Sequence, residues 1–294
     1  MGSSGSAADA RHHLSVPASA GVVVVAYATT TLDLAWLPSE VPLVVVRNDD
    51  QLSDAAVHHP NTRHLRPGTN VGFGAAVNLA AATIDTERIV LVNPDVELTP
   101  EHWPALASGE ANEVRTVALV DDDGPTSVVS AYPTPLSHLV GGYRVGRFAG
   151  RDSTLRRVAA PLLGSSGRTH TDSLRHPVGR WPLATRWVSG AVMALDHARF
   201  DAVGRFSSRY FLYYEDLDLC ARLAARFPDM EAVVVDAPAG HHAVGGSDNA
   251  GDPRTSAAER YRLGSAITYA RQKTGFGWRV CAGALEARDR WRNR

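Results

Sequence analysis

The sequence of 294 residues has little cysteine, hardly any lysine and no long hydrophobic run. Two cysteines, Cys220 and Cys281, cannot hold a fold together and lack the spacing of a zinc site, so a reducing cytoplasm is the expected compartment. The longest apolar run, around residues 21–28, has the length of a strand. It is well short of the roughly 18 residues that a membrane span requires. We therefore expect a globular protein without a transmembrane helix.

Lysine occurs once, at Lys273, and arginine carries nearly all of the positive charge. The formal net charge of −1 hides an uneven distribution. Residues 144–186 hold nine arginines against two aspartates, a net charge of +7, and residues 271–294 carry a net charge of +5. The remaining residues must then carry −13 to give the total of −1. Such asymmetry is typical of proteins that meet anionic partners, although arginines can also serve only to solvate loops and a tail.

The first half of the chain alternates short β-branched runs with helical stretches. Such apolar runs are typical of strands that are buried on both faces of a sheet. Strands are expected at residues 22–26, 42–46, 88–92 and 116–120, and helices at residues 75–84 and 100–106. This alternation predicts a three-layer α/β protein with a mostly parallel central sheet.

The second half is less regular. Residues 124–186 are rich in Gly, Pro, Ser and Arg and show little periodicity, so we expect a long loop with at most one short helix. Beyond it the pattern predicts a strand or strand pair at residues 187–195, a strand at 231–235, and helices at 196–203, 214–226 and 256–274.

Two motifs lie where strands of the first half end. In residues 70–78 (NVGFGAAVN), Gly72 and Gly74 allow a ligand close to the backbone, and a helix start favours an anion. Packing alone would also explain them, and no Gly-Lys-Ser/Thr of a P-loop follows. The second motif is Asn93-Pro94-Asp95, whose carboxylate could bind a divalent cation with a diphosphate, or could simply cap a turn.

Two further motifs lie in the second half. Glu215, Asp216 and Asp218 open a helix directly after an aromatic block, which would desolvate a carboxylate and suit it to act as a general base. Part of this acidity is ordinary matching of the helix dipole. His242 follows the last strand and could complete a metal site with Asp95, although a histidine pair in a loop usually has no such role.

Taken in order, these motifs resemble the inverting glycosyltransferases of family 2, which have the GT-A fold. The resemblance covers about residues 20–250 and is strongest to the rhamnosyltransferase branch of actinobacterial cell-wall and polysaccharide synthesis. The matching motifs are Val25–Tyr27, Asn70–Asn78, Asn93–Asp95, Trp187–Gly190, Gly204–Arg222 and His242–Ser247. Each motif alone is weak, whereas the ordered set is specific.

The resemblance assigns roles to residues of this chain. It implies that Asp216 is the general base, supported by Glu215 and Asp218, and that Asp95 and His242 hold Mg²⁺ or Mn²⁺. It also implies a set of residues that line the nucleotide-sugar site: Tyr27, Asn70, Gly72, Gly74, Asn78, Asn93, Asp95, Trp187, Ser189 and Gly190.

The resemblance also implies a Rossmann-like αβα architecture with a mostly parallel sheet and a long irregular acceptor-side region. Residues 1–18 are set apart as a tag or disordered N-terminus, because MGSSGS reads as an expression-vector scar. Residues 19–255 would form the catalytic domain, with 19–123 binding the nucleotide sugar and 124–255 facing the acceptor. Residues 256–294 would form a C-terminal helix and a basic tail.

The implied reaction is the transfer of a hexose, with L-rhamnose as first candidate, from a dTDP-, UDP- or GDP-linked donor to a hydroxyl acceptor. One desolvated carboxylate takes the acceptor proton, the configuration is inverted, and a metal stabilises the leaving diphosphate. The acceptor is expected to be a lipid-linked diphosphate or a glycoside. The basic residues 144–186 and 271–294 would face this acceptor and the anionic inner face of the cell membrane.

One segment departs from the family pattern. Where the family has Asp-Asn-x-Ser-x-Asp after the second strand, this chain has Arg47 in place of the leading acid. Asp49 or Asp50 would then bind the nucleotide through a local shift, or base recognition differs.

Two other functions fit the same motifs: a sugar-nucleotide mutase or isomerase, and a homologue that binds nucleotide sugars without turnover. A mutase would convert a donor without any acceptor, and the presence of Glu215, Asp216, Asp95 and His242 argues against a purely binding protein. No nucleic-acid partner is expected, and a homodimer is compatible with the sequence.

Overall fold

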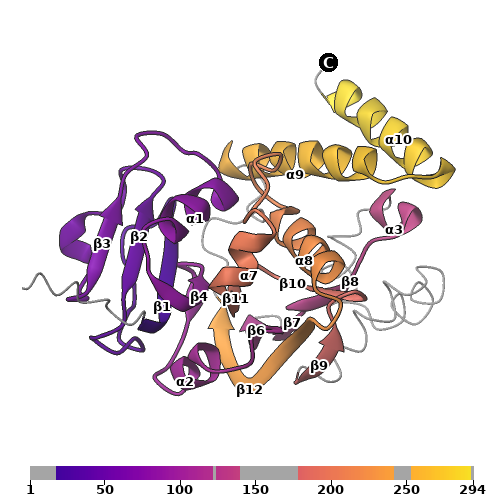
Figure 1. Ribbon diagram of the computed structural model, residues 1–294. Helices are drawn as coiled ribbons and strands as arrows, with labels where there is room; N and C mark the ends of the chain where they lie inside the picture. Colours follow the sequence, from indigo (N-terminus) through magenta and orange to yellow (C-terminus); the bar gives the residue numbers. More distant parts are fainter. Residues whose placement is uncertain (1–17, 122–123, 140–177, 242–252, 293–294) are drawn as a thin grey trace, which may run out of the picture.

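The computed structural model describes residues 18–121, 124–139, 178–241 and 253–292 (Figure 1). Its centre is a ten-stranded sheet in the order β3-β2-β1-β4-β11-β6-β12-β5, with β7 paired to β6 and β9 paired to β12. The strands are β1 (Ala18–Ala26), β2 (Leu43–Arg47), β3 (Thr62–Leu65), β4 (Thr86–Val92), β5 (Val96–Glu97), β6 (Glu113–Asp121), β7 (Gly124–Thr126), β9 (Gly179–Pro182), β11 (Val192–Asp196) and β12 (Glu231–His241).

The long strands of this sheet run mostly in one direction. β3, β2, β1 and β4 are parallel neighbours, and β12 is parallel to β6. β11 lies between β4 and β6 and is antiparallel to both. The expected α/β class with a mostly parallel sheet is therefore confirmed. The antiparallel β11 was not predicted, because strand direction follows from chain connections and not from the apolar run itself.

The central strands owe their position to runs of β-branched residues. Val22, Val23 and Val24 of β1 are all almost fully buried, as are Val44 and Val45 of β2. Side chains on both faces of a strand are buried only when helices or loops cover both sides of the sheet. The apolar runs that predicted buried strands therefore do mark the middle of the fold.

Helices cover both sides of the sheet. They are α1 (Phe73–Ala81), α2 (His102–Ala107), α7 (His197–Ala202) and α8 (Glu215–Arg226), with a 3-10 turn, η1, at Asp54–Ala56. Figure 1 shows α1, α7 and α8 on one side and α2 on the other. On the side of α2, the rings of Trp36 and Trp103 are in contact, with their centroids 6.3 Å apart. The three-layer arrangement thus follows the sequence expectation.

The segment expected to be one long loop contains regular structure where it is described. β7, β8 (Val129–Ala131), α3 (Pro135–Leu139), β9 and β10 (Arg186–Val188) all lie between residues 124 and 188, and β8 pairs with β10 in a second, two-stranded sheet. The expectation of an irregular region was wrong for β7, β8 and β9, whereas β10 and β11 match the strand pair expected at residues 187–195. Strands of three or four residues are too short to show a period. β7 and β9 pair with the longer strands β6 and β12, whereas β8 and β10 pair with each other. Residues 140–177 lie outside the described part.

The C-terminal residues also differ from expectation. α9 (Pro253–Gln272) matches the predicted helix, but the expected basic tail is a second helix, α10 (Phe276–Arg292). Figure 1 shows α9 crossing above α8, with α10 as the outermost element beyond it. Within the described residues, no helix is both long enough and apolar enough to cross a bilayer.

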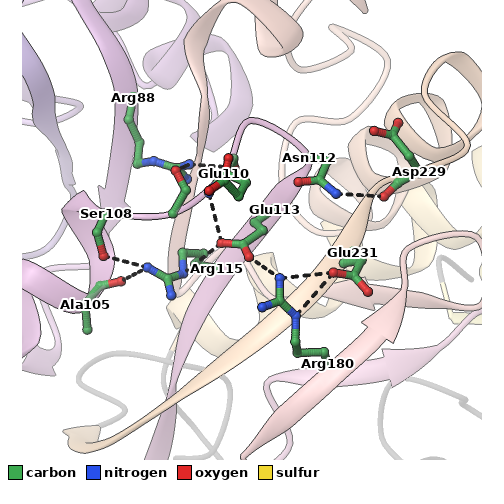
Figure 2. Close-up of polar contacts among 11 residues, drawn as sticks. Arg88, Ala105, Ser108, Glu110, Asn112, Glu113, Arg115, Arg180, Asp229 and Glu231 are labelled. Carbon is green, nitrogen blue, oxygen red and sulfur yellow. Dashed lines mark hydrogen bonds and ion pairs between the residues drawn. The ribbon is translucent and has the colours of Figure 1, made fainter.

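Buried charges join several strands at the edge of the sheet where β6 and β12 begin (Figure 2). The Glu113 carboxylate is almost fully buried and accepts hydrogen bonds from Arg180 on β9 and from the backbone N–H of Glu110, 3.2 Å away. It also lies 3.3 Å from the Arg115 guanidinium. The same Arg180 pairs with Glu231 on β12, whose side chain is far more exposed. One carboxylate thus satisfies several donors that would otherwise lose hydration.

Replacement of Glu113 should therefore be costly. We expect Glu113→Ala to lower the free energy of unfolding by about 3 kcal/mol, because it leaves the largely buried guanidinium of Arg115 without its anion. Glu231→Ala removes another partner of Arg180 at a half-exposed position and should cost less than about 1 kcal/mol. Urea denaturation followed by circular dichroism measures both. Equal losses in the two variants would contradict the importance of the buried contact.

Candidate active site

The expected site residues gather at the edge of the sheet where its parallel strands end. Tyr27 follows β1, Asp49 and Asp50 follow β2, and Asp95 follows β4. β11 joins them from the opposite direction, since the N–H of Asn93 donates to the carbonyl of Ala191, 2.8 Å away, just before β11 begins. Ligands of open α/β sheets bind at this edge.

Asparagine side chains shape the turn that leads into α1. The Asn48 amide is buried; it donates to Asn70 Oδ1 (2.8 Å) and accepts from the N–H of Val71 (2.9 Å). Asn70 Oδ1 also accepts from the N–H of Gly72 at 3.0 Å. Asn48 was not predicted as a site residue. The sequence feature that could have identified Asn48 was its position directly after the second strand, next to the altered Arg47.

Gly72 has a backbone conformation that favours glycine. Its φ is +86°, and a Cβ atom here would overlap the carbonyl oxygen of Phe211. The next N–H, that of Phe73, donates to this same carbonyl at 3.0 Å. Gly72 is therefore required because the loop before α8 packs directly against the start of α1. A Cβ at Gly74 would likewise lie 2.8 Å from Phe206 Cβ and 3.6 Å from Glu215 Cβ.

Asn78 has a different partner from the expected nucleotide sugar. Its Nδ2 donates to the carbonyl of Phe206 (2.8 Å), and its Oδ1 accepts from the N–H of the same residue (3.0 Å). Arg205 also donates to the Asn78 carbonyl, at 3.0 Å. Both ends of the amide thus hold the chain between α7 and α8 in place. The structure makes Asn78 a residue that positions this loop.

The altered segment after β2 has a clear local role. The Asp49 carboxylate accepts from the N–H of Ala28 at 2.6 Å and of Gln51 at 3.1 Å, so it fixes the turn beside the half-exposed Tyr27. Arg47 pairs with Asp54, 2.9 Å away. Asp50 is exposed at the surface. Among these acids, Asp49 is the one that the structure ties to the end of β1.

Two buried carboxylates lie at the start of α8. Asp216 Oδ2 accepts from the N–H of Gly190 (3.1 Å), and Oδ1 accepts from the N–H of Leu217 (2.8 Å). Glu215 is equally buried, and its Oε2 atom has no hydrogen-bond partner among the described residues. Asp218, by contrast, pairs with Arg222 one turn along the helix, at 2.7 Å.

Burial dominates the acid–base properties of this pair. Loss of hydration raises the pKa of Glu215, and the neighbouring Asp216 charge raises it further. Burial also raises the pKa of Asp216, while the backbone N–H groups of Gly190 and Leu217 oppose that rise. The two carboxyls therefore compete for one negative charge, and hydrogen bonding favours placing it on Asp216. Such an anion in an apolar site is a stronger base than an exposed aspartate.

The loop in front of this pair is strained. Tyr213 and Tyr214 have φ values of +68° and +71°, which non-glycine residues seldom adopt. α9 holds the loop from outside: Ser265 Oγ donates to the carbonyl of Leu212 (2.9 Å), and the Arg262 guanidinium lies 4.6 Å from the centre of the Tyr213 ring. The Phe211 and Tyr261 rings are also in contact, at 4.4 Å.

An aromatic cluster extends this support to α3 and α10. The Tyr214 hydroxyl lies 3.3 Å from His138 Nδ1, and His138 Nε2 lies 2.9 Å from the Ala266 carbonyl. The His138 ring contacts the Tyr269 and Trp278 rings, each with its centroid 5.5 Å away. Burial lowers the pKa of His138, so its imidazole is neutral in this cluster.

The remaining expected residues line the neighbouring segment. Trp187 is buried, and its indole N–H donates to the Ala131 carbonyl at 3.2 Å. The Ser189 hydroxyl accepts from the N–H of Ala191 at 3.4 Å. A Cβ atom at Gly190 would lie 3.4 Å from the Phe73 ring and 3.7 Å from Asp216 Cβ. The structure thus brings Gly190, Asp216 and the start of α1 together.

The expected metal ligands can be compared with the structure only in part. His242 lies outside the described residues, and within those residues no cluster of three or more His, Cys, Asp or Glu could hold a metal. Strand pairing is informative, because His241, the last residue of β12, is the register partner of Val96. The strand that leads to His242 therefore ends next to the residue after Asp95. The carboxylate of Asp95 is a ligand of the type that suits Mg²⁺ or Mn²⁺.

Two other features lie away from this edge. A surface groove of about 820 Å³ is lined by residues at the opposite ends of the strands, including Asp85, Glu87 and His197, and by none of the expected site residues. Of the nine arginines in residues 144–186, seven fall in the undescribed range 140–177. Arg180, within the described part, belongs to the ion-pair network of Glu113.

Comparisons with known proteins agree with the motif order. No protein-family model matches the chain. It is 30% identical over 212 residues to N-acetylglucosaminyl-diphospho-decaprenol L-rhamnosyltransferase of Mycobacterium tuberculosis, which confirms the expected resemblance to rhamnosyltransferases. The alignment covers 64% of this chain and 62% of that protein, so the chain spans less than two thirds of the length of the relative it matches.

Solved structures with a similar arrangement are also glycosyltransferases. A mannosyltransferase from Pyrobaculum calidifontis in complex with GDP-Man and Mn²⁺ aligns with a TM-score of 0.48 and 14% identity, over 92% of this chain and 69% of that one. GalNAc-T7 with UDP, GalNAc and Mn²⁺ aligns with a TM-score of 0.47 and 10% identity, over 76% of this chain and 44% of that one.

The raised pKa of Glu215 makes a prediction about stability. Because the folded state holds the Glu215 proton more tightly than the unfolded state, the free energy of unfolding falls as pH rises above the ordinary glutamate pKa of about 4.3. Glu215→Gln removes this loss, so we expect its melting temperature at pH 8 to exceed that of the parent by about 2–4 °C. The difference should vanish near pH 4, where both side chains are neutral. Melting curves that differ equally at both pH values would contradict the effect.

Proposed function

We propose that this chain is an inverting, metal-dependent glycosyltransferase that moves a sugar from a nucleotide diphosphate to a hydroxyl group. The buried pair Glu215–Asp216 carries this proposal. It lies at the carboxyl edge of a parallel sheet, beside a glycine of the Trp187–Gly190 motif and the glycine-rich start of α1. The similarity to a rhamnosyltransferase supports L-rhamnose as the sugar. The proposed carrier is dTDP.

In the proposed reaction Asp216 is the general base. Its ionised carboxylate takes the proton of the acceptor hydroxyl while that oxygen forms a bond to the anomeric carbon. The bond from the anomeric carbon to the phosphate oxygen breaks at the opposite face, so the product has inverted configuration and a nucleotide diphosphate leaves. Hydrogen bonds from Gly190 and Leu217 fix the direction of the carboxylate. The neighbouring Glu215 stays protonated and preserves the negative charge on Asp216.

Donor binding involves the other end of the site. Asp95 and His242 would hold a Mg²⁺ or Mn²⁺ ion, which when bound stabilises the charge of the leaving diphosphate. Tyr27, fixed by the turn that Asp49 caps, would contact the nucleotide, and the glycine-rich start of α1 would lie near the nucleotide and its sugar. The Glu215 oxygen of the buried pair has no partner among the residues that the structure describes. Such a pair argues against a protein that only binds nucleotide sugars, because it reduces stability without serving binding.

The acceptor is proposed to be a lipid-linked diphosphate. The relative's name includes N-acetylglucosaminyl-diphospho-decaprenol, which fits an enzyme that works at the cytoplasmic face of the membrane. Cell-wall or polysaccharide synthesis is the corresponding process.

The role of the base can be tested by a single atom change. We expect Asp216→Asn to lower kcat by about a hundredfold to ten-thousandfold with little change in donor affinity, because an amide cannot take the acceptor proton. Asp229→Asn, just beyond the end of α8, loses only an exposed ion pair with Arg199, so its kcat should stay within about threefold of the parent. Steady-state transfer from dTDP-L-rhamnose to a soluble glycoside acceptor measures both.

The pH profile is a second readout of the same experiment. Because burial raises the pKa of Asp216, kcat of the parent should rise with pH through a value above the ordinary aspartate pKa of about 3.9. An Asp216→Asn enzyme with the activity and pH profile of the parent would refute the assignment of the base.

Donor and metal binding can be measured without turnover. We expect dTDP-L-rhamnose to raise the melting temperature when Mn²⁺ or Mg²⁺ is present and to have little effect after chelation, because a ligand that binds only the folded state stabilises it. Asp95→Asn should weaken this metal-dependent shift, whereas Glu97→Gln, two residues along the chain, serves as the matched control. An undiminished shift in the presence of a strong chelator would remove the metal role of Asp95 and His242. UDP- and GDP-sugars, tested in parallel, identify the nucleotide.

A further inference from the structure

α10 has one face packed into the protein. Cys281, Ala282 and Leu285 are buried on this face, and Trp278 belongs to the aromatic cluster around His138. These contacts hold α10 against α9 and α3. The orientation of the helix about its own axis is therefore fixed, and its other face must point outward.

The outward face of α10 carries an apolar stripe. Phe276 is 82% exposed, Val280 51% and Trp291 79%. Together with the exposed Ala284 and Ala287, they follow one another at steps of three or four residues, which places them along one line of a helix. Large apolar side chains exposed in a row on one helix indicate an interaction surface.

Arginines lie on both flanks of this stripe. Arg279 and Arg290 are eleven residues apart and share one flank, and Arg288 lies on the other. All three are exposed, and within the described part of the chain none of them forms an ion pair. The acidic Glu286 is already paired with Arg271, 2.8 Å away. The outward face of α10 is therefore both apolar and cationic.

We infer that α10 is an interfacial helix that docks this protein on an anionic lipid bilayer. Phe276, Val280 and Trp291 would enter the boundary between headgroups and acyl chains, and the flanking arginines would bind lipid phosphates. This inference rests on the proposed function for the identity of the acceptor: docking would hold the enzyme at the bilayer that contains a lipid-linked acceptor. The surface itself is independent of the reaction.

The charges favour a bilayer over a second copy of the chain. Pairing of two such stripes around a twofold axis would place the arginine rows of one copy beside those of the other, which is unfavourable without intervening anions. An anionic bilayer supplies phosphates on both flanks. The position of α10 also fits, since Figure 1 shows it as the outermost element, with no part of the sheet beyond it.

Docking through α10 would orient the active site. α10 packs on α9, and α9 holds the loop that precedes Glu215 through Tyr261, Arg262 and Ser265. The membrane-facing helix and the base are therefore linked by a short series of packed side chains. A lipid-linked acceptor would approach from the side on which α9 and α10 lie.

Vesicle binding tests the inference with the full chain and without donor or acceptor. We expect the protein to co-sediment with vesicles of equimolar phosphatidylglycerol and phosphatidylcholine at low salt. The double variant Phe276→Ser/Trp291→Ser should bind at least about tenfold more weakly, because two apolar side chains no longer leave water. Leu79→Ser, which removes a half-exposed apolar side chain from α1, is the matched control and should bind like the parent.

The arginines and the alternative partner are tested separately. Arg279→Gln/Arg290→Gln should weaken binding to the anionic vesicles, and added salt should weaken binding of the parent. Equal affinity of the parent for pure phosphatidylcholine vesicles, or of parent and Phe276→Ser/Trp291→Ser for anionic ones, would overturn the inference. So would a dimer of the parent in sedimentation velocity that this double variant loses.

Activity separates this inference from the proposed function. With a water-soluble acceptor, Phe276→Ser/Trp291→Ser should keep the turnover of the parent, since neither side chain contacts the active site. Loss of vesicle binding with retained transfer supports docking by α10. Vesicle binding by a parent protein that shows no transfer would leave α10 as a membrane helix and refute the glycosyltransferase proposal alone.

Discussion

Two adjacent carboxylates, Glu215 and Asp216, are held out of water at the start of α8, and much of the surrounding structure keeps them there. This burial lowers stability in two ways: Tyr213 and Tyr214 have strained backbones, and one Glu215 oxygen has no hydrogen-bond partner among the described residues. Three parts of the fold hold this arrangement: the start of α1, the segment at Gly190 before β11, and α9 from outside. Two buried carboxyl groups that share one negative charge stay in place only if the surrounding segments cannot move to let water in. These contacts hold the segments in place.

Sequence patterns were most informative for strands that are buried on both faces of the sheet. The β-branched runs of β1, β2 and β4 predicted strands, because a strand covered on both faces has few alternatives. β3 was missed because its sequence, TRHL, is largely polar and only partly buried at the rim of the sheet. The short strands β7, β8 and β9 were missed for a related reason: they pair with β6, β10 and β12, and no local pattern shows such pairings.

Site residues were predictable as members of a motif and less so in their individual roles. Motif order placed Gly190, Glu215 and Asp216 in one region, and the structure brings these residues together. It could not show that Asn78 bonds the backbone of Phe206, because that contact joins segments 128 residues apart. Asn48 was overlooked for the same reason. The basic tail was expected to contact anionic lipid, but it was not expected to be helical, and its apolar residues form a stripe only on a helix.

The dependence of the aromatic loop on α9 also affects the order in which the protein matures. Phe211, Leu212 and Tyr213 are held by Tyr261, Ser265 and Arg262, which are synthesised after the loop and after β12. A chain still emerging from the ribosome can complete most of the sheet before these partners exist. The loop before Glu215 and Asp216 therefore gains these contacts only after α9 has been synthesised, later than most of the sheet.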